Sequence, residues 1–163
     1  MKKMITELPE IKLVGITART NNLNEINPAT AKISSTVQHY FHHALANKIP
    51  NRKNPGITFC VYTDYESDHT GDYTYFIGEE INALTDLPTE FVTLTIQPQS
   101  YAKFTTEQGA MPAVLINAWQ KIWQMTDKDF GAPRNYHADF ELYDERASDH
   151  QRVILDIYIG INM

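Results

Sequence analysis

The stretch "ADFELYDERASDHQRVILDIYIGI", residues 138–161, contains two apolar segments that flank a polar connection. Aromatic and β-branched side chains dominate "FELY" and "DIYIGI", a composition typical of β-strands. The intervening "RASDHQ" has the polar composition of a turn. The stretch therefore predicts two neighbouring strands, and the first of them carries an acidic residue, Glu141, between Phe140 and Leu142.

The first half of the chain contains a matching pair of segments. "FCVY" at residues 59–62 corresponds to "FELY" at 140–143, and "TYFIG" at 74–78 corresponds to "DIYIG" at 156–160. The two matches occur in the same order, and their spacing agrees to one residue. Sequence similarity at a constant offset indicates an internal repeat, so we interpret the chain as a duplication.

A helical pattern precedes each strand pair. In the first half, Asn27 and Pro28 are typical of a helix start, and apolar residues recur at helical spacing from Ile33 onward. In the second half, "AVLINAWQKIWQM" places Trp119 and Trp123 on one helical face. A strand-like segment precedes each helix, so each half is expected to run strand, helix, strand, strand. We therefore expect an α+β fold in which duplicated β-α-β-β units, related by pseudo-twofold symmetry, form an antiparallel sheet with two helices.

Length and composition limit the class of protein. A chain of 163 residues fits a single domain over residues 1–163, with repeat 1 at about 8–88 and repeat 2 at about 89–163. The formal net charge of −6 disfavours direct nucleic-acid binding, which requires a basic face. No segment is typical of a signal peptide or a membrane span. We therefore expect a cytoplasmic protein without membrane association.

Few residues suggest metal or cofactor chemistry. The single cysteine, Cys60, excludes an internal disulfide. His39 and His43 are four residues apart on a predicted helix, but no third ligand accompanies them, so we interpret them as part of a solvated face. The glycine-rich motifs that bind nucleotides are absent from the sequence. We predict neither a metal nor a cofactor.

The repeat also predicts which strand residues share a surface. It superimposes four pairs: Cys60 on Glu141, Tyr62 on Tyr143, Thr74 on Asp156 and Phe76 on Tyr158. Successive side chains of a strand alternate between its two faces. From this alternation we expect one surface with four aromatic rings, and with two carboxylates that come from the second half only. Such a surface is typical of a small-molecule site.

Several of these residues also have a simpler interpretation. Alternation alone favours a solvent-exposed Glu141, with Phe140 and Leu142 turned inward. The alternative is a partly desolvated carboxylate among aromatic rings, which would attract a cationic ligand. Trp119 and Trp123 could anchor their helix to the sheet or line a ligand site. Asp156 lies in an otherwise apolar segment and therefore needs either water or a partner.

With these residues identified, the chain resembles the GyrI-like small-molecule-binding domain, which is also the effector-binding domain of AraC- and MerR-type transcription regulators. The match rests on four segments in the expected order: "KLVGITART", "VYTDYESDHTGDYTYFIG", "YAKFTTEQGAMPAVLINAWQKIW" and "DFELYDERASDHQRVILDIYIGI". The last of them is the most specific. Together the segments span nearly the whole chain.

The resemblance implies a ligand cleft between the two helices and the sheet. It places Glu141 at the base of the cleft among aromatic rings, where it meets cationic, lipophilic ligands. Tyr143 and Tyr158 match positions that are typically aromatic, and Asp156 matches one that is often acidic. Trp119 and Trp123 fall in the region that closes the cleft. The ligand-binding residues that we expect are therefore Glu141, Tyr143, Asp156, Tyr158, Tyr62, Phe76, Trp119 and Trp123.

The resemblance also has a limit, because the basic helix-turn-helix domain of the regulators has no counterpart in this sequence. We therefore expect a stand-alone effector-binding or multidrug-type protein, connected with transcription regulation or with the response to drugs and toxins. Its expected partner is a small molecule, with a separate regulator or DNA gyrase as a possible protein partner. One alternative is a hydrolase of small electrophiles that uses Glu141 as the acid/base, assisted by Tyr143 or Asp156. Another is a gyrase inhibitor.

Overall fold

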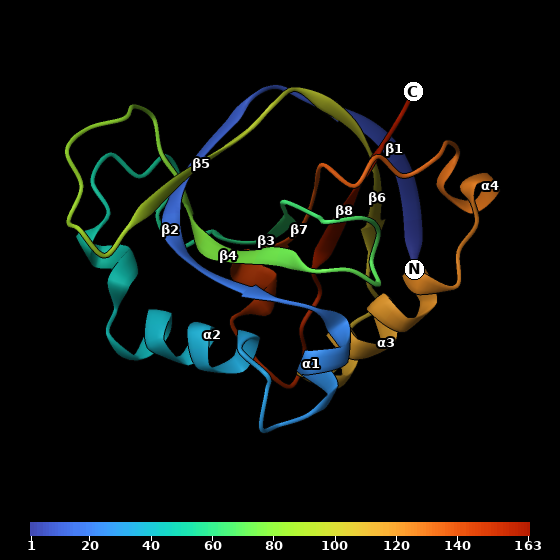
Figure 1. Cartoon of the computed structure of the whole chain (residues 1–163), viewed down its shortest axis with the longest axis horizontal. Helices are drawn as coiled ribbons and strands as arrows, with labels where there is room; N and C mark the ends of the chain where they lie inside the picture. Colours follow the sequence, from blue (N-terminus) through green and yellow to red (C-terminus); the bar gives the residue numbers. More distant parts are fainter.

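Eight antiparallel strands form one curved sheet in the computed structural model, which describes residues 1–163 (Figure 1). The strands occur in the order β1-β6-β8-β7-β3-β4-β2-β5. Their bounds are β1 Lys2–Leu8, β2 Ile11–Thr20, β3 Thr58–Thr63, β4 Tyr73–Glu80, β5 Val92–Ile96, β6 Gln99–Thr105, β7 Ala138–Tyr143 and β8 Asp156–Ile161. The helices are α1 Asn22–Ile26, α2 Ile33–His42, α3 Ala113–Trp123 and α4 Asp127–Phe130, with short 3₁₀ turns at Leu45–Lys48 and Glu145–Ala147.

The order of the strands is symmetric about the centre of the sheet. If each strand of the first half is replaced by its counterpart in the second half, β1 by β5 through β4 by β8, and the reverse, the same list of strands results, read from the other end. The central pair is β3 and β7, in which Cys60 lies directly opposite Glu141. These two residues are the ones that the repeat superimposes, so the pseudo-twofold axis passes between them. The predicted α+β fold with duplicated units is confirmed, and Glu141 lies beside the axis.

The first strand, β1, was not expected from the sequence. It pairs with β6 of the second half, while β5 pairs with β2 of the first half, so the two halves exchange their first strands. The segment "KKMITEL" is largely exposed and lacks the alternation of apolar and polar residues, so hydrophobic periodicity does not predict a strand there. The duplication would have predicted this strand. Pro98 follows the strand β5 closely, and Pro9 stands at the corresponding place after residues 2–8.

The start of the first long helix also differs from the prediction. Helix α2 begins at Ile33, and Asn27 instead follows the short helix α1. The side chain of Glu25 accepts hydrogen bonds from the backbone N–H groups of Lys32 and Ile33, at 2.8 and 3.0 Å. A carboxylate from α1 therefore satisfies the free N–H groups at the start of α2, the task that an N-cap side chain usually performs.

This contact predicts a measurable loss of stability in Glu25→Ala. Without the carboxylate, two N–H groups at the start of α2 lose their acceptor, and the free energy of unfolding should fall by about 1 kcal/mol. Urea denaturation provides the measurement. Glu107→Ala is the matched control, because Glu107 is an exposed glutamate that lies outside the helices. Equal stabilities of the two variants would show that Glu25 does not cap α2.

Both faces of the central strands are buried. Helices α2 and α3 lie on one face (Figure 1). Ala118, Trp119 and Ile122 of α3 pack in one core with Ile157 and Ile159 of β8. The curved sheet covers the other face with its own core, which includes Phe59, Phe76, Tyr101, Phe140 and Tyr158. Strand β7 therefore has no solvent-exposed face on which Glu141 could lie.

None of the helices combines the length and apolar character that crossing a membrane requires.

Candidate functional site: an aromatic cleft above a buried glutamate

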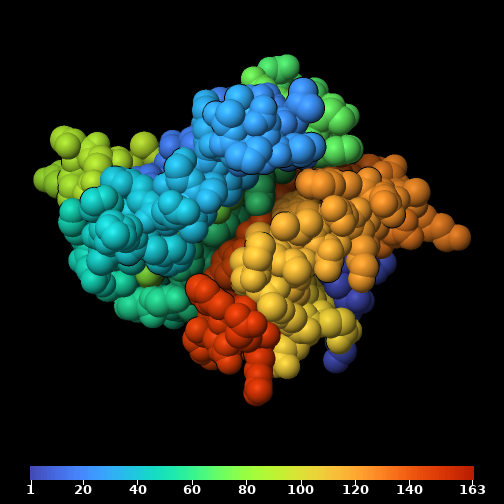
Figure 2. Space-filling view, turned by 90° about the horizontal axis from the view of Figure 1, so that it is seen from below, coloured from blue at the N-terminus to red at the C-terminus, as the bar shows by residue number.

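A cleft of about 330 Å³ lies between the α1–α2 segment and α3. The space-filling view from the side of the helices shows a groove between α2 and α3, with sheet residues in its depth (Figure 2). Helix α3 contributes Leu115, Ile116, Trp119 and Trp123 to the cleft, and Ile33 and Ser34 of α2 lie on the other side. Tyr62, Tyr65 and Tyr73 contribute aromatic surface from β3, the loop after it and β4. Aromatic and aliphatic side chains thus form most of the surface that a ligand would meet.

Glu141 lies beneath two of these rings and is only 1% exposed. Its Oε2 accepts hydrogen bonds from the Tyr62 hydroxyl at 2.5 Å and from the Trp119 indole Nε1 at 2.8 Å. Its Oε1 accepts a hydrogen bond from the Tyr143 hydroxyl at 2.7 Å. All three partners are donors, and no basic side chain forms an ion pair with Glu141. The carboxylate is therefore hydrogen-bonded, but no positive charge in the protein balances it.

The protonation of this group follows from its surroundings. Burial raises the pKa of the Glu141 carboxyl above its ordinary value, while the three hydrogen bonds act in the opposite direction. Burial, together with the nearby Glu141 charge, also raises the pKa of Tyr62 and Tyr143 well above their ordinary values. Both tyrosines therefore stay neutral at physiological pH and keep the hydroxyl protons that they donate to Glu141.

The rings around Glu141 contact one another. The ring of Tyr62 lies 5.0 Å from Trp119 and 5.4 Å from Tyr75, in edge-to-face geometry in both cases. Trp119 is buried and belongs to the core beneath α3, yet it also lines the cleft. Trp123 lies 6.3 Å from Trp119, lines the same cleft and is 42% exposed at its rim. The two alternatives for Trp119 are thus both true, since one ring anchors the helix and borders the cleft.

This architecture agrees with one protein family. Residues 4–161 match the Cass2 family, described as integron-associated effector binding protein. The chain belongs to the Cass2 family. The resemblance to a GyrI-like effector-binding domain, expected from the sequence, is thereby confirmed. Effector binding is the role that the family description gives.

Three relatives illustrate the similarity of this Cass2-family protein to others. An integron cassette protein from the mobile metagenome of Vibrio cholerae shares 26% identity and a TM-score of 0.78, with 98% of this chain and 95% of that chain covered. The Bacillus subtilis (strain 168) protein YobU, which its name describes as a transcriptional regulator, is 24% identical over 157 residues, 96% of each chain. The structure of SAV2435 bound to tetraphenylphosphonium has 19% identity and a TM-score of 0.76, covering 99% of this chain and 94% of that one.

The structure of the Cass2-family protein separates the residues that we predicted to share one surface. Glu141, Tyr143, Tyr62 and Trp119 meet, as their hydrogen bonds show. Three other predicted residues, Phe76, Asp156 and Tyr158, lie on the opposite face of the sheet. In the observed register Glu141 pairs with Ile157, whereas Tyr158 pairs with Phe140, and Phe76 pairs with Val61. The expectation of a single surface is therefore wrong.

The residues on the opposite face have other partners. The Tyr158 ring stacks on Phe140, with ring centroids 4.5 Å apart. Asp156 accepts hydrogen bonds from Thr105 at 2.7 Å and from Arg146 at 2.7 Å. Asp156 thus has the partner that its apolar surroundings require. Alternation assigns the faces within one strand, but the register between two strands decides which faces coincide, and a shift of one residue exchanges them.

Several residues at the cleft of this Cass2-family protein were not predicted from the sequence. Tyr73 lines the cleft, and it shares a face of the sheet with Tyr62 and the buried Tyr75, because Tyr75 pairs directly with Tyr62 in the β3–β4 hairpin. The tyrosine alternation in "YTYF" was a usable signal for them once the hairpin register was known. His69 and Arg134 also line the cleft, but they come from loops without a repeating pattern. For these two residues the sequence contained no usable signal.

Proposed function

We propose that the protein binds lipophilic organic cations in the aromatic cleft, with Glu141 as the balancing charge. One observation carries this proposal, namely a fully buried carboxylate, beneath the cleft, that has hydrogen-bond donors but no basic partner. A buried charge without a counter-charge is unfavourable. A bound cation would supply the missing positive charge.

The rings between Glu141 and the cleft transmit this attraction. Tyr62 and Trp119 donate their polar hydrogens to Glu141 while their ring surfaces border the cleft. A cation over an aromatic face is attracted by the electron density of the ring, and donation to a carboxylate increases that density. A ligand can therefore interact with the Glu141 charge through the rings without reaching the carboxylate itself.

A second buried carboxylate shows why Glu141 is the better candidate. Asp139 lies two residues away on the same strand and face, and it is fully buried. However, Arg134 donates to Asp139 at 2.6 Å, so this charge is already balanced within the protein. SAV2435, whose fold is similar, has been solved with the lipophilic cation tetraphenylphosphonium, which supports the choice of this ligand class.

A matched pair of ligands tests the proposal. Methyltriphenylphosphonium and triphenylphosphine oxide have similar size and shape, but only the first is a cation. Both tryptophans of the chain line the cleft, so quenching of tryptophan fluorescence reports binding directly. We expect the cation to bind at least about tenfold more tightly, since it gains both ring and charge attraction. Equal affinities would show that charge is not recognised and would contradict the proposal.

A further inference from the structure

A second cavity of about 140 Å³ adjoins the aromatic cleft. Three residues, His69, Trp123 and Arg134, line both spaces. The rest of the smaller cavity is largely apolar, with Ile122, Met125, Phe130 and Pro133, and it also includes Tyr136 and the exposed Asp127. The two spaces therefore meet at a corner where an imidazole and a guanidinium are the main polar groups.

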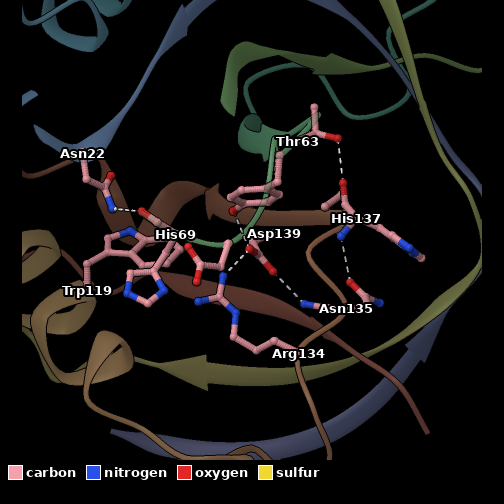
Figure 3. A network of polar contacts seen from close by, with 12 residues as sticks. Asn22, Thr63, His69, Trp119, Arg134, Asn135, His137 and Asp139 are labelled. Atoms are coloured by element: carbon pink, nitrogen blue, oxygen red, sulfur yellow. Dashed lines mark hydrogen bonds and ion pairs between the residues drawn. The ribbon is translucent and has the colours of Figure 1, made fainter. Parts of the chain in front are cut away.

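The guanidinium of Arg134 has unused hydrogen-bonding capacity. Its side chain is only 7% exposed, and its one hydrogen bond runs from Nη2 to Asp139 (Figure 3). The Nε atom is buried and has no partner. The guanidinium lies 4.3 Å from the ring centroid of Tyr136, which holds it in place but accepts no conventional hydrogen bond. Because a guanidinium has five N–H donors, most of them lack an acceptor in the protein.

His69 adds a second unpaired group at the same corner. Its Nδ1 is buried without a partner, and in the corresponding tautomer this atom donates a hydrogen bond. Asn22 donates to the backbone oxygen of His69 at 2.9 Å, which fixes the segment beside the cleft. In Figure 3, the His69 ring and the Trp119 indole lie on the same side of the Arg134 guanidinium.

The acceptors near these donors do not satisfy them. Asp127 also lines the smaller cavity, but it forms no hydrogen bond with Arg134 or His69. Asp139 already accepts from Arg134, from the Tyr65 hydroxyl at 2.5 Å and from the backbone N–H of Gly160 at 2.8 Å. Buried polar groups without a partner are unfavourable, and each one in a native structure calls for an explanation. An acceptor that belongs to the ligand would satisfy both Arg134 and His69.

The spacing along β7 relates this corner to the buried glutamate. Asp139 and Glu141 are two residues apart on one face, which corresponds to roughly 7 Å at the usual rise of a strand. The guanidinium bonded to Asp139 and the rings bonded to Glu141 therefore lie within the span of a single drug-sized molecule. One molecule could place its cationic centre near Tyr62 and Trp119 and a substituent at Arg134.

From this geometry we propose that the cleft selects bifunctional ligands. These ligands are lipophilic cations that carry a substituent able to accept hydrogen bonds, and a carboxylate is the strongest such acceptor. The substituent binds Arg134 and His69 at the junction of the two cavities. This inference rests on the proposed cation binding and specifies the ligand class further. It also gives the two halves of the pseudosymmetric cleft different roles, since only one end carries the guanidinium.

Benzyltriphenylphosphonium and (4-carboxybenzyl)triphenylphosphonium test the inference, because they differ only in the carboxylate. In isothermal titration calorimetry at pH 7.5, we expect the carboxylated compound to bind about tenfold more tightly, as is typical of a charge-assisted hydrogen bond. Equal or weaker binding of the carboxylated compound, with benzyltriphenylphosphonium still bound, would overturn this inference alone. If neither compound bound, the proposed function would fail, and the inference would fail with it.

Two variants locate the effect. Arg134→Gln combined with Asp139→Asn removes both charges of the buried pair together and keeps polar groups that can bond to each other. It should reduce the preference for the carboxylate, measured as the ratio of the two dissociation constants, to less than about twofold. His69→Phe retains a ring of similar size, leaves the buried pair intact and should reduce the preference about threefold. An unchanged preference in His69→Phe, or in the folded double variant, would contradict the assignment.

Discussion

Glu141→Gln is expected to weaken the binding of tetraphenylphosphonium by about 30- to 100-fold. The variant keeps the shape of the side chain and removes the charge. A unit charge about 6–8 Å from a cation, at the effective dielectric typical of protein sites, accounts for an effect of this size. Titration of tryptophan fluorescence in wild type and variant gives the ratio of dissociation constants. A ratio below about threefold would remove Glu141 from the site.

Glu79→Gln is the matched control for this measurement. Glu79 is also a buried glutamate of the sheet, but it pairs with Arg52 at 3.4 Å and does not line the cleft. The same loss of one negative charge at Glu79 should leave the affinity within about twofold of wild type. If both variants weakened binding equally, the effect would come from net charge or from general destabilisation instead of from the site.

The dependence on pH supplies an independent signature of Glu141. Because burial raises the pKa of this carboxyl, cation binding should weaken on acidification at a higher pH than an exposed glutamate would cause. The folding stability of the free protein depends on pH in the opposite direction, so acidification increases it. The stabilising contribution of Glu141 is fully present below its unfolded pKa, and it is lost as the pH rises through the raised folded value. Dissociation constants measured from pH 4.5 to 8 should show this dependence in wild type and lack it in Glu141→Gln.

The second large effect concerns the buried pair of Arg134 and Asp139. Arg134→Met should lower the free energy of unfolding by about 3–5 kcal/mol, because it leaves the carboxylate of Asp139 buried without its counter-charge. Urea denaturation followed by far-ultraviolet circular dichroism measures this loss. Adding Asp139→Asn to the variant should recover most of it, since the uncompensated charge is then gone. If the double variant stayed as unstable as Arg134→Met, the loss would come from the missing packing of Arg134 against Tyr136 and not from the charge of Asp139.

Arg146→Met provides the comparison for an ion pair that is less buried. Arg146 bonds to Asp144 and Asp156, but a third of its own side chain is exposed. Asp156 also keeps its hydrogen bond from Thr105 and its ion pair with Lys103 when Arg146 is removed. The expected loss is therefore about 1 kcal/mol or less. A loss as large as that of Arg134→Met would show that burial does not decide the strength of these pairs.

Much of the fold could be predicted because its signals are local. The strand pairs, the helix at Ala113–Trp123 and the repeat between "FCVY" and "FELY" all follow from residue types and their spacing. Strand β1 was missed because it is an exposed edge strand without apolar alternation. Its counterpart β5 shows that duplication can reveal an element that periodicity alone does not.

The candidate site was predictable only in part. The resemblance to a family placed Glu141 among aromatic rings, and its contacts with Tyr62, Tyr143 and Trp119 agree with that expectation. Alternation alone favoured an exposed Glu141, because it assumes that one face of a strand meets water. In this fold helix α3 covers that face and the curved sheet covers the other.

The sequence by itself determined the duplication, the order strand, helix, strand, strand that both halves share, and the presence of an acid, Glu141, where the other half has Cys60. Only the tertiary structure decided which side chains meet. The register of β7 against β8 put Tyr158 and Asp156 on the face opposite Glu141, and the chain path brought His69 and Arg134 to the cleft. Spacing along the chain determines the local conformation, whereas register and loop path depend on packing between segments far apart in the sequence.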